Sequence, residues 1–177
     1  MSKQTPTMKS ENEVERHTLT VLVDNEAGVL ARVVGLFSGR GYNIESLTVA
    51  EVDPMARTSR ITIVTSGTLH VIEQIEQQLK RLVPTHKVTN WTSAKAGIER
   101  EMALIKVAGT GEKRVEALRM ADAFRARPVD TTHSSFVFEI TGSPAKIDSF
   151  VDLMRPLGLV DVSRTGVAAI SRGPEAM

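Results

Sequence analysis

Residues 18–50 (TLTVLVDNEAGVLARVVGLFSGRGYNIESLTVA) constrain the fold more than any other part of the chain. Alternating apolar residues predict a strand over His17–Asp24. Apolar residues at helical spacing predict a helix over Val29–Arg40, and glycines follow at its end. Alternation returns over Asn43–Val52 and predicts a second strand. The polar residues at the turns, such as Asn25, are small amides, so this stretch is suited to hold a small molecule rather than to react with it.

The rest of the first half continues the same pattern. Ser59–Thr65 is β-branched and predicts a third strand, Thr68–Arg81 predicts an amphipathic helix, and Thr85–Trp91 predicts a short fourth strand. The order βαββαβ is that of a ferredoxin-like unit. We expect both helices on one face of its sheet, leaving an open apolar face that pairs with another chain.

The second half repeats this order. We expect a strand over Glu101–Ala108, a helix over Lys113–Arg127, a strand pair near residues 128–141, a helix from Ser143 to Met154, and a final strand within Gly158–Ser171. The predicted class is α+β with two ferredoxin-like βαββαβ units. The expected divisions are a disordered extension (1–16), a first domain (17–92), a linker (93–100) and a second domain (101–173).

Composition narrows the function classes. Hydrophobic residues make up 41% and charged residues 24% of the 177 residues, as in soluble globular proteins. The net charge of +1 lacks the excess of positive charge that is typical of proteins that bind nucleic acid or an anionic membrane. The absence of cysteine excludes disulfides and thiolate metal sites. With no apolar run near the ~20 residues of a membrane span and no secretory signal, we expect a cytoplasmic protein.

The residues offer no catalytic or metal constellation. The chain lacks the common nucleophile, zinc and phosphate-loop motifs. Gly109 and Gly111 follow a predicted strand, but the third glycine of a dinucleotide loop is missing, so a simple turn explains them better. The acids Glu45, Glu51 and Asp53 have no partner base and are interpreted as a solvated strand face. The four histidines fall in separate elements: His17, His70, His86 and His133.

A binding site is the better candidate. Asn25 precedes Gly28 where a strand passes into a helix, and helix N-termini bind carboxylates. Asn43, at the start of the second strand, can also meet a carboxylate or an ammonium group. Aliphatic residues around them (Leu30, Ile44 and Val49) suit a small branched side chain. An equally good explanation is purely structural: Asn25 caps the helix and Asn43 fills a left-handed turn after Gly41.

A resemblance to a known family rests on five stretches of the chain. They are DNEAGVLARVVGLFSGRGYNIESLTVAEVD, SRITIVTSG, GIEREMALIKV, FVFEITGSPAKIDSFVDLM and SRTGVAAISRG. Residues 17–173 resemble the regulatory small subunit of acetolactate synthase (acetohydroxyacid synthase, AHAS), and the first domain resembles an ACT domain. The resemblance implies no active site and no cofactor in this chain. It implies a separate catalytic subunit, with thiamine diphosphate, Mg²⁺ and FAD, that this chain activates and makes sensitive to inhibition by valine, leucine or isoleucine.

The resemblance also implies a homodimer or larger assembly in which ACT domains pair side by side and the effector lies at their seam. The family's effector contacts fall on Asn25, Gly28 and Asn43, with Val29, Leu30 and Ile44 beside them, and Asn43 comes from the neighbouring chain. Competing readings are a free-standing amino-acid sensor, an ACT domain serving a transcription factor, and an enzyme in its own right. The small net charge argues against DNA binding.

Overall fold

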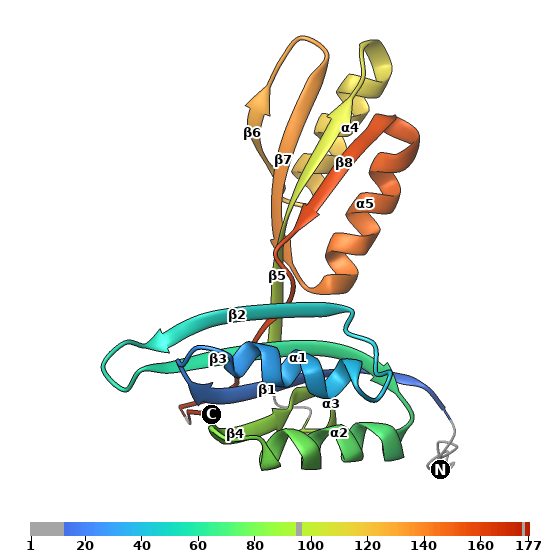
Figure 1. Ribbon diagram of the computed structural model, residues 1–177. Coiled ribbons are helices and arrows are strands. Elements are labelled where there is room, and N and C mark those ends of the chain that lie inside the picture. Colours follow the sequence, from blue (N-terminus) through green and yellow to red (C-terminus); the bar gives the residue numbers. More distant parts are fainter. Residues whose placement is uncertain (1–12, 95–96, 175) are drawn as a thin grey trace, which may run out of the picture. The chain divides into compact units, whose positions relative to one another are not determined.

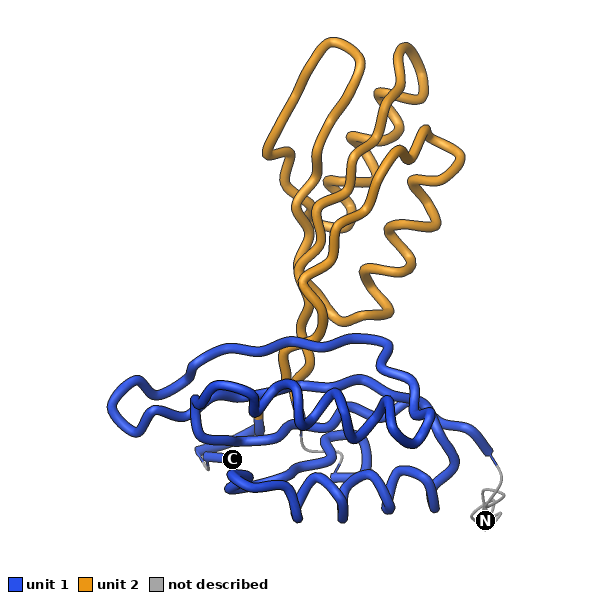
Figure 2. The backbone as a smooth tube through the Cα atoms, in the orientation of Figure 1, with its two compact units in different colours: residues 1–97, 171–177 blue, residues 98–170 orange. Residues whose placement is uncertain are grey.

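The computed structural model describes residues 13–94, 97–174 and 176–177. The chain forms two compact units (Figure 2). One holds the residues up to Gly97 together with those from Ser171 onward, and the other holds Ile98–Ile170. Each combines helices with an antiparallel sheet, so the predicted α+β class with two ferredoxin-like units is confirmed (Figure 1). Residues 1–12 of the predicted extension lie outside the described residues.

The first unit follows the predicted order of elements. These are β1 (Glu15–Asp24), α1 (Val29–Ser38), β2 (Ser46–Asp53), β3 (Thr58–Gly67), α2 (Leu69–Arg81) and β4 (Thr85–Asn90). The sheet order is β2-β3-β1-β4, so β2 lies at an edge beside α1 (Figure 1). β4 ends one residue earlier than predicted because Trp91 begins a short helix, α3 (Trp91–Ala94).

The core of the first unit lies between the sheet and the two long helices. On β1, Leu19 and Val21 point inward and oppose Ile63 and Ile61 on β3. The apolar stripes of the helices complete this core, through Val29, Val33, Leu36 and Phe37 of α1 and Ile72, Ile75 and Leu79 of α2. Each buried side chain of this size stabilises the fold by about 1.5–3 kcal/mol, so the stripes determine which helix faces stay outside.

The opposite face of this sheet is not the bare apolar surface expected from the sequence. It carries the buried residues Thr18, Thr20 and Thr62. The indole Nε1 of Trp91 donates to Thr20 Oγ1 at 2.7 Å, and the Thr18 N–H donates to Thr92 Oγ1 at 3.1 Å. The chain therefore folds back through α3 over this face, which leaves the β2 edge as the more accessible part of the sheet.

The second unit repeats the order. Its elements are β5 (Gly97–Ala108), α4 (Gly111–Ala123), β6 (Arg127–Thr131), β7 (Ser135–Gly142), α5 (Pro144–Gly158), β8 (Leu159–Arg164) and β9 (Ala168–Ser171). The sheet order is β6-β7-β5-β8, and β9 also pairs with β5. Its core clusters around three phenylalanines, Phe136, Phe138 and Phe150.

Several boundaries in this unit differ from the prediction. Residues 97–100, expected in the linker, are the first residues of β5. Helix α4 ends at Ala123 rather than Arg127, because Arg125 adopts a positive φ of 57°. The predicted final strand is two strands, β8 and β9, separated around Gly166, whose φ is 83°.

Helix α5 begins as predicted but ends later. Ser143 is its N-cap, and its Oγ accepts from the Lys146 N–H at 3.3 Å. The helix continues past Met154 to Gly158, where φ is 107°. A Cβ on Gly158 would overlap the carbonyl oxygen of Ala108, the last residue of β5. Only glycine therefore lets the helix end pass this close to the sheet.

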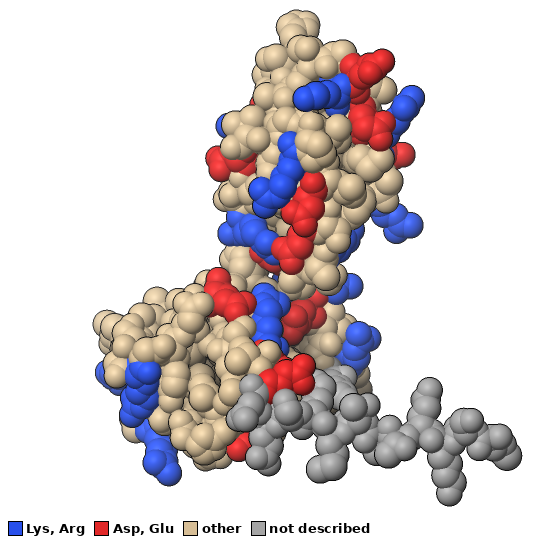
Figure 3. All heavy atoms as spheres, turned by 90° about the vertical axis from the view of Figure 1, so that its right-hand side faces the viewer, with Lys and Arg blue, Asp and Glu red and all other residues tan. Residues whose placement is uncertain are grey.

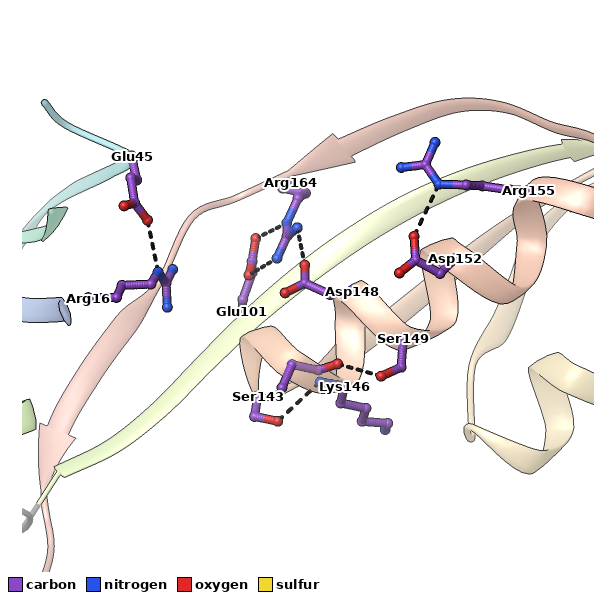
Figure 4. Close-up of polar contacts among 11 residues, drawn as sticks. Arg16, Glu45, Glu101, Ser143, Lys146, Asp148, Ser149, Asp152, Arg155 and Arg164 are labelled. Atoms are coloured by element: carbon purple, nitrogen blue, oxygen red, sulfur yellow. Dashed lines mark hydrogen bonds and ion pairs between the residues drawn. The ribbon is translucent and has the colours of Figure 1, made fainter. Parts of the chain in front are cut away.

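Ion pairs hold strand and helix ends in both units (Figure 4). Arg164 on β8 donates to both carboxylate oxygens of buried Glu101, at 2.5 and 2.7 Å, and to Asp148 on α5 at 2.6 Å. The Glu101 bonds raise the pKa of Arg164 most, and this charge compensates the buried Glu101 carboxylate. In the first unit Glu45 accepts from the Arg16 Nε at 2.9 Å and from the Ser66 hydroxyl.

Replacing Gly158 by alanine should lower the free energy of unfolding by about 3 kcal/mol, through the strained φ and the overlap with Ala108. The matched control is Gly111→Ala, where φ is also positive at 59° but the added Cβ meets nothing within 4 Å. The Gly111→Ala substitution should lower the free energy of unfolding by only about 1–2 kcal/mol. Urea unfolding of both variants measures this, and equal losses would contradict the role assigned to the Ala108 contact.

Glu45→Gln should reduce stability at pH 7 by at most about 1 kcal/mol, because the pair with Arg16 is solvent-exposed. The Ser66 hydroxyl, more than Arg16, lowers the pKa of the Glu45 carboxyl below 4.5, against the opposing effect of burial. The stabilisation is therefore present above pH ~4.5 and is lost as the pH falls through the lower folded-state pKa. Urea unfolding at pH 7, 5 and 3 should show the deficit vanish as the Glu45 carboxyl of the parent becomes protonated. A pH-independent deficit would contradict this.

Candidate functional site

A backbone hydrogen bond fixes the position of Asn25 in the turn between β1 and α1. The Asn25 N–H donates to the Arg57 carbonyl at 2.6 Å, at the start of the neighbouring strand β3. The helix N-cap is Gly28, with φ 86° and no side-chain capping bond. The explanation in which Asn25 caps the helix is therefore wrong, because the turn places the cap three residues later.

The Asn25 carboxamide instead reaches the edge strand. Its Nδ2 donates to Glu51 Oε1 at 3.0 Å, and both side chains are exposed. The sequence interpretation treated Glu51 as part of a solvated strand face and missed this contact. Residue spacing could not reveal it, because the contact depends on β2 and the turn lying at the same end of the sheet. The carboxylate and the amide oxygen can accept hydrogen bonds from an ammonium group, and the amide NH2 can donate to a carboxylate.

The first turn of α1 adds backbone donors. The Val29 N–H donates to the Glu26 carbonyl at 3.4 Å, but Leu30 and Ala31 have no intrahelical acceptor. No acidic residue lies in this first turn, so no side chain of the turn itself compensates the positive end of the helix dipole. Leu30 is 41% exposed, whereas Val29 is buried in the core. The turn therefore offers N–H donors, an amide and one accessible aliphatic side chain.

The other predicted site residues lie before β2. The Asn43 side chain is exposed, and its carbonyl accepts from Thr65 Oγ1 at 2.6 Å. Among the described non-glycine residues only Arg57 and Arg125 have positive φ, so Asn43 does not occupy a left-handed turn. Gly41, with φ 68°, takes that role. Ile44 is half-buried against the core, so it can support a site from beneath rather than line it fully.

One chain does not bring these two groups together. Asn25 and Gly28 lie near the end of β2, through the Glu51 contact, and Asn43 and Ile44 precede its start. The eight residues of β2 span about 25 Å at 3.3 Å per residue. The predicted site residues therefore form two half-sites at opposite ends of one exposed strand.

The described part of the chain offers no candidate metal centre. There, no group of three or more histidine, aspartate or glutamate side chains could hold a metal ion. Three histidines each have a single partner: His86 with Asp24 at 2.6 Å, His17 with Asn90, and His70 with Gln74. None of the helices in the described residues has the length and apolar character needed to cross a membrane.

Comparisons with known proteins match the two halves of the chain to two separate family models. Residues 19–87 match the model of an AHAS small subunit-like ACT domain, and residues 100–173 match the model of the small subunit of acetolactate synthase. A probable acetolactate synthase small subunit of Archaeoglobus fulgidus is 47% identical over 89% of this chain and 98% of its own length. The acetolactate synthase isozyme 3 small subunit of Escherichia coli is 44% identical over 92% of this chain and 99% of its own.

A solved structure has the same fold over nearly the whole chain. The acetolactate synthase small subunit from Thermotoga maritima superposes with a TM-score of 0.79 at 36% identity, covering 91% of this chain and 99% of that one. Matches of this extent and identity include both halves of the chain and leave no large region unaccounted for. The chain therefore belongs to the family of acetolactate synthase small subunits, with an ACT domain in its first half.

Proposed function

We propose that this chain is a regulatory subunit that raises the activity of a separate catalytic subunit and makes it sensitive to feedback inhibition by valine or another branched-chain amino acid. In this proposal the chain has no active site of its own. Thiamine diphosphate, Mg²⁺ and FAD belong to the catalytic subunit. The observation that carries the proposal is the position of the two asparagine half-sites at opposite ends of the exposed edge strand β2.

A two-fold contact along β2 would complete the site. An edge strand presents unpaired backbone N–H and C=O groups that pair readily with another strand. In a symmetric dimer the same surface meets itself, so two β2 strands would run antiparallel. The start of one strand then lies beside the end of the other, which brings Asn43 of one protomer next to Asn25 of its partner. Each dimer would contain two such sites along one seam.

The groups that meet at the seam suit an aliphatic amino acid. The free N–H groups of Leu30 and Ala31 would bind the effector carboxylate at the start of α1. The two carboxamides would supply acceptors for its ammonium group. Leu30 and Val49, which are 41% and 43% exposed, would contact a branched side chain. The chemistry favours valine, leucine and isoleucine as a class without ranking them.

Helix α1 would carry the signal, because the effector binds at its N-terminus. An effector changes the partner's activity only if it binds two arrangements of the subunits unequally, typically by ~1–3 kcal/mol. Valine at the seam would tie the Asn25 turn of one protomer to the Asn43 segment of the other. That connection would favour one arrangement of paired ACT domains over another.

Asn25→Ala and Gly28→Asp should remove valine inhibition while leaving activation of the catalytic subunit largely intact. The first removes an amide contact. The second adds a carboxylate beside the free N–H groups and strains a backbone with φ 86°. Acetolactate formation from pyruvate, measured with the catalytic subunit over a valine titration, tests both. Inhibition like that of the parent would show that the site is elsewhere. Activity of the chain without the catalytic subunit would overturn the regulatory role.

Mixing two defective variants tests the seam itself. Asn25→Ala and Asn43→Ala should each abolish valine binding. After co-refolding in equal amounts, mixed dimers would contain one intact site, which is about a quarter of the parental number overall for random pairing. Calorimetry with valine measures the recovered sites. If both asparagines acted within one protomer, the mixture would recover none.

A further inference from the structure

A shallow surface depression, called the α1–α2 groove below, lies between α1 and α2 and the residues that follow each helix in the first unit. It consists of two adjoining hollows of about 860 and 490 Å³ that share Arg40, Gln78 and Arg81. On α1 the lining residues follow one helical stripe that includes Arg32 and Gly35. The groove opens to solvent, and its floor includes Leu36 of the core and Leu82, which packs against that core.

The groove is basic and largely uncompensated. Arg32 donates to the Val83 carbonyl at 2.6 Å. Within the described residues, neither Arg40 nor Arg81 has a carboxylate at ion-pair distance, and both side chains are exposed. Glu73 is the one acidic residue among those that line the hollows. The groove therefore carries a net positive charge that the described chain does not neutralise.

Two helix arginines of the second unit have local carboxylate partners, whereas a third, Arg114 on α4, stacks on the Phe136 ring at 3.9 Å from its centroid. On α4 and α5, Arg119 pairs with Glu116 at 3.5 Å and Arg155 pairs with Asp152 at 3.1 Å. Figure 3 shows the same contrast: blue and red side chains lie side by side on the second unit, whereas several blue side chains of the first unit have no red neighbour. Arg40 and Arg81 thus differ from Arg119 and Arg155, which have carboxylate partners, and from Arg114, which packs on an aromatic ring.

A buried acceptor in the groove also lacks a partner. The Oε1 of Gln78 is inaccessible to solvent and accepts no hydrogen bond within the described chain. Such atoms are uncommon, because leaving a buried acceptor unsatisfied costs free energy. Rotation of the Gln78 side chain toward the groove would be needed before a donor of an incoming chain could satisfy this acceptor.

Gly35 is a third unusual feature of this face. A glycine inside a helix destabilises it by roughly 0.5–1 kcal/mol relative to alanine. A Cβ built on Gly35 meets nothing within 4 Å, so packing within this chain does not require glycine. Its absence of a side chain opens the groove floor to close approach by another backbone.

We propose that the α1–α2 groove is the docking surface for the catalytic subunit, and that it receives an acidic segment of that subunit. Carboxylates would pair with Arg40 and Arg81, the Gln78 side chain would turn outward to accept from a donor, and the incoming backbone would pass over Gly35. The inference rests on the proposed function for the identity of the partner. It also gives α1 two contacts, the effector at its N-terminus and the catalytic subunit along its outer face, separated by at most the ~15 Å length of a ten-residue helix.

The double variant Arg40→Glu/Arg81→Glu should bind the catalytic subunit about tenfold or more weakly, because both attractions become repulsions. The matched control is Arg119→Glu/Arg155→Glu on the second unit, which should bind like the parent. Surface plasmon resonance with immobilised catalytic subunit measures both. The parent affinity should also fall as sodium chloride rises, and less so for the groove variant. Parental affinity in the groove variant, or an equal loss in the control, would overturn the proposal.

Gly35→Trp tests the groove without changing its charge. It should weaken docking by a similar factor, whereas Gly35→Ala should fold well and dock nearly as the parent does, because its Cβ has open space. Docking of Gly35→Trp at full affinity would show that the groove stays empty in the complex.

Valine binding to each variant alone separates the two proposals. All groove variants should keep parental valine affinity, which also shows that they fold. If the parent docks through the groove but valine neither binds nor inhibits, the proposed feedback function fails and the docking surface stands. If valine inhibits as proposed but the groove variants bind the catalytic subunit with parental affinity, the feedback function stands and the docking surface is wrong.

Discussion

The antiparallel pairing of β1 with β3 is the constraint on which the rest of the first unit depends. Its register places Asp24 opposite Thr58, so the turn that follows β1 meets the turn that precedes β3. The backbone bond from Asn25 to Arg57 then sets where α1 begins. Since β3 also pairs with β2, the same register brings Glu51 to the Asn25 side chain.

The sheet order has equally direct consequences. With β1 and β3 in the centre, β2 lies at an edge and α1 lies next to it. An edge strand and a helix N-terminus at one end of it are two groups of unsatisfied backbone donors in one place. The proposed dimer would use the edge, and the proposed effector would use the helix end. The outer face of α1 remains for the catalytic subunit.

Much of this could be predicted from the sequence. Alternation and helical spacing predicted all six main elements of the first unit, since period-two and period-3.6 patterns are local properties. Boundaries were less predictable. The sequence pattern predicts that Trp91 ends a strand. Trp91 instead begins a helix, where its indole hydrogen-bonds to Thr20, 71 residues away in sequence. Helix α4 ends early at Arg125, whose positive φ no side-chain pattern indicates.

The sequence by itself determined the family through its resemblance to known members, and it determined the element order and the candidates Asn25, Gly28 and Asn43 through residue types and their spacing. Tertiary structure alone decided where those candidates lie and what they contact. It excluded helix capping by Asn25 and a left-handed turn at Asn43, and it joined Asn25 to Glu51. It also separated the two asparagines along β2 and aligned Arg40 with Arg81 across the α1–α2 groove. These relations depend on strand order and helix packing, which are long-range and leave no mark in local spacing.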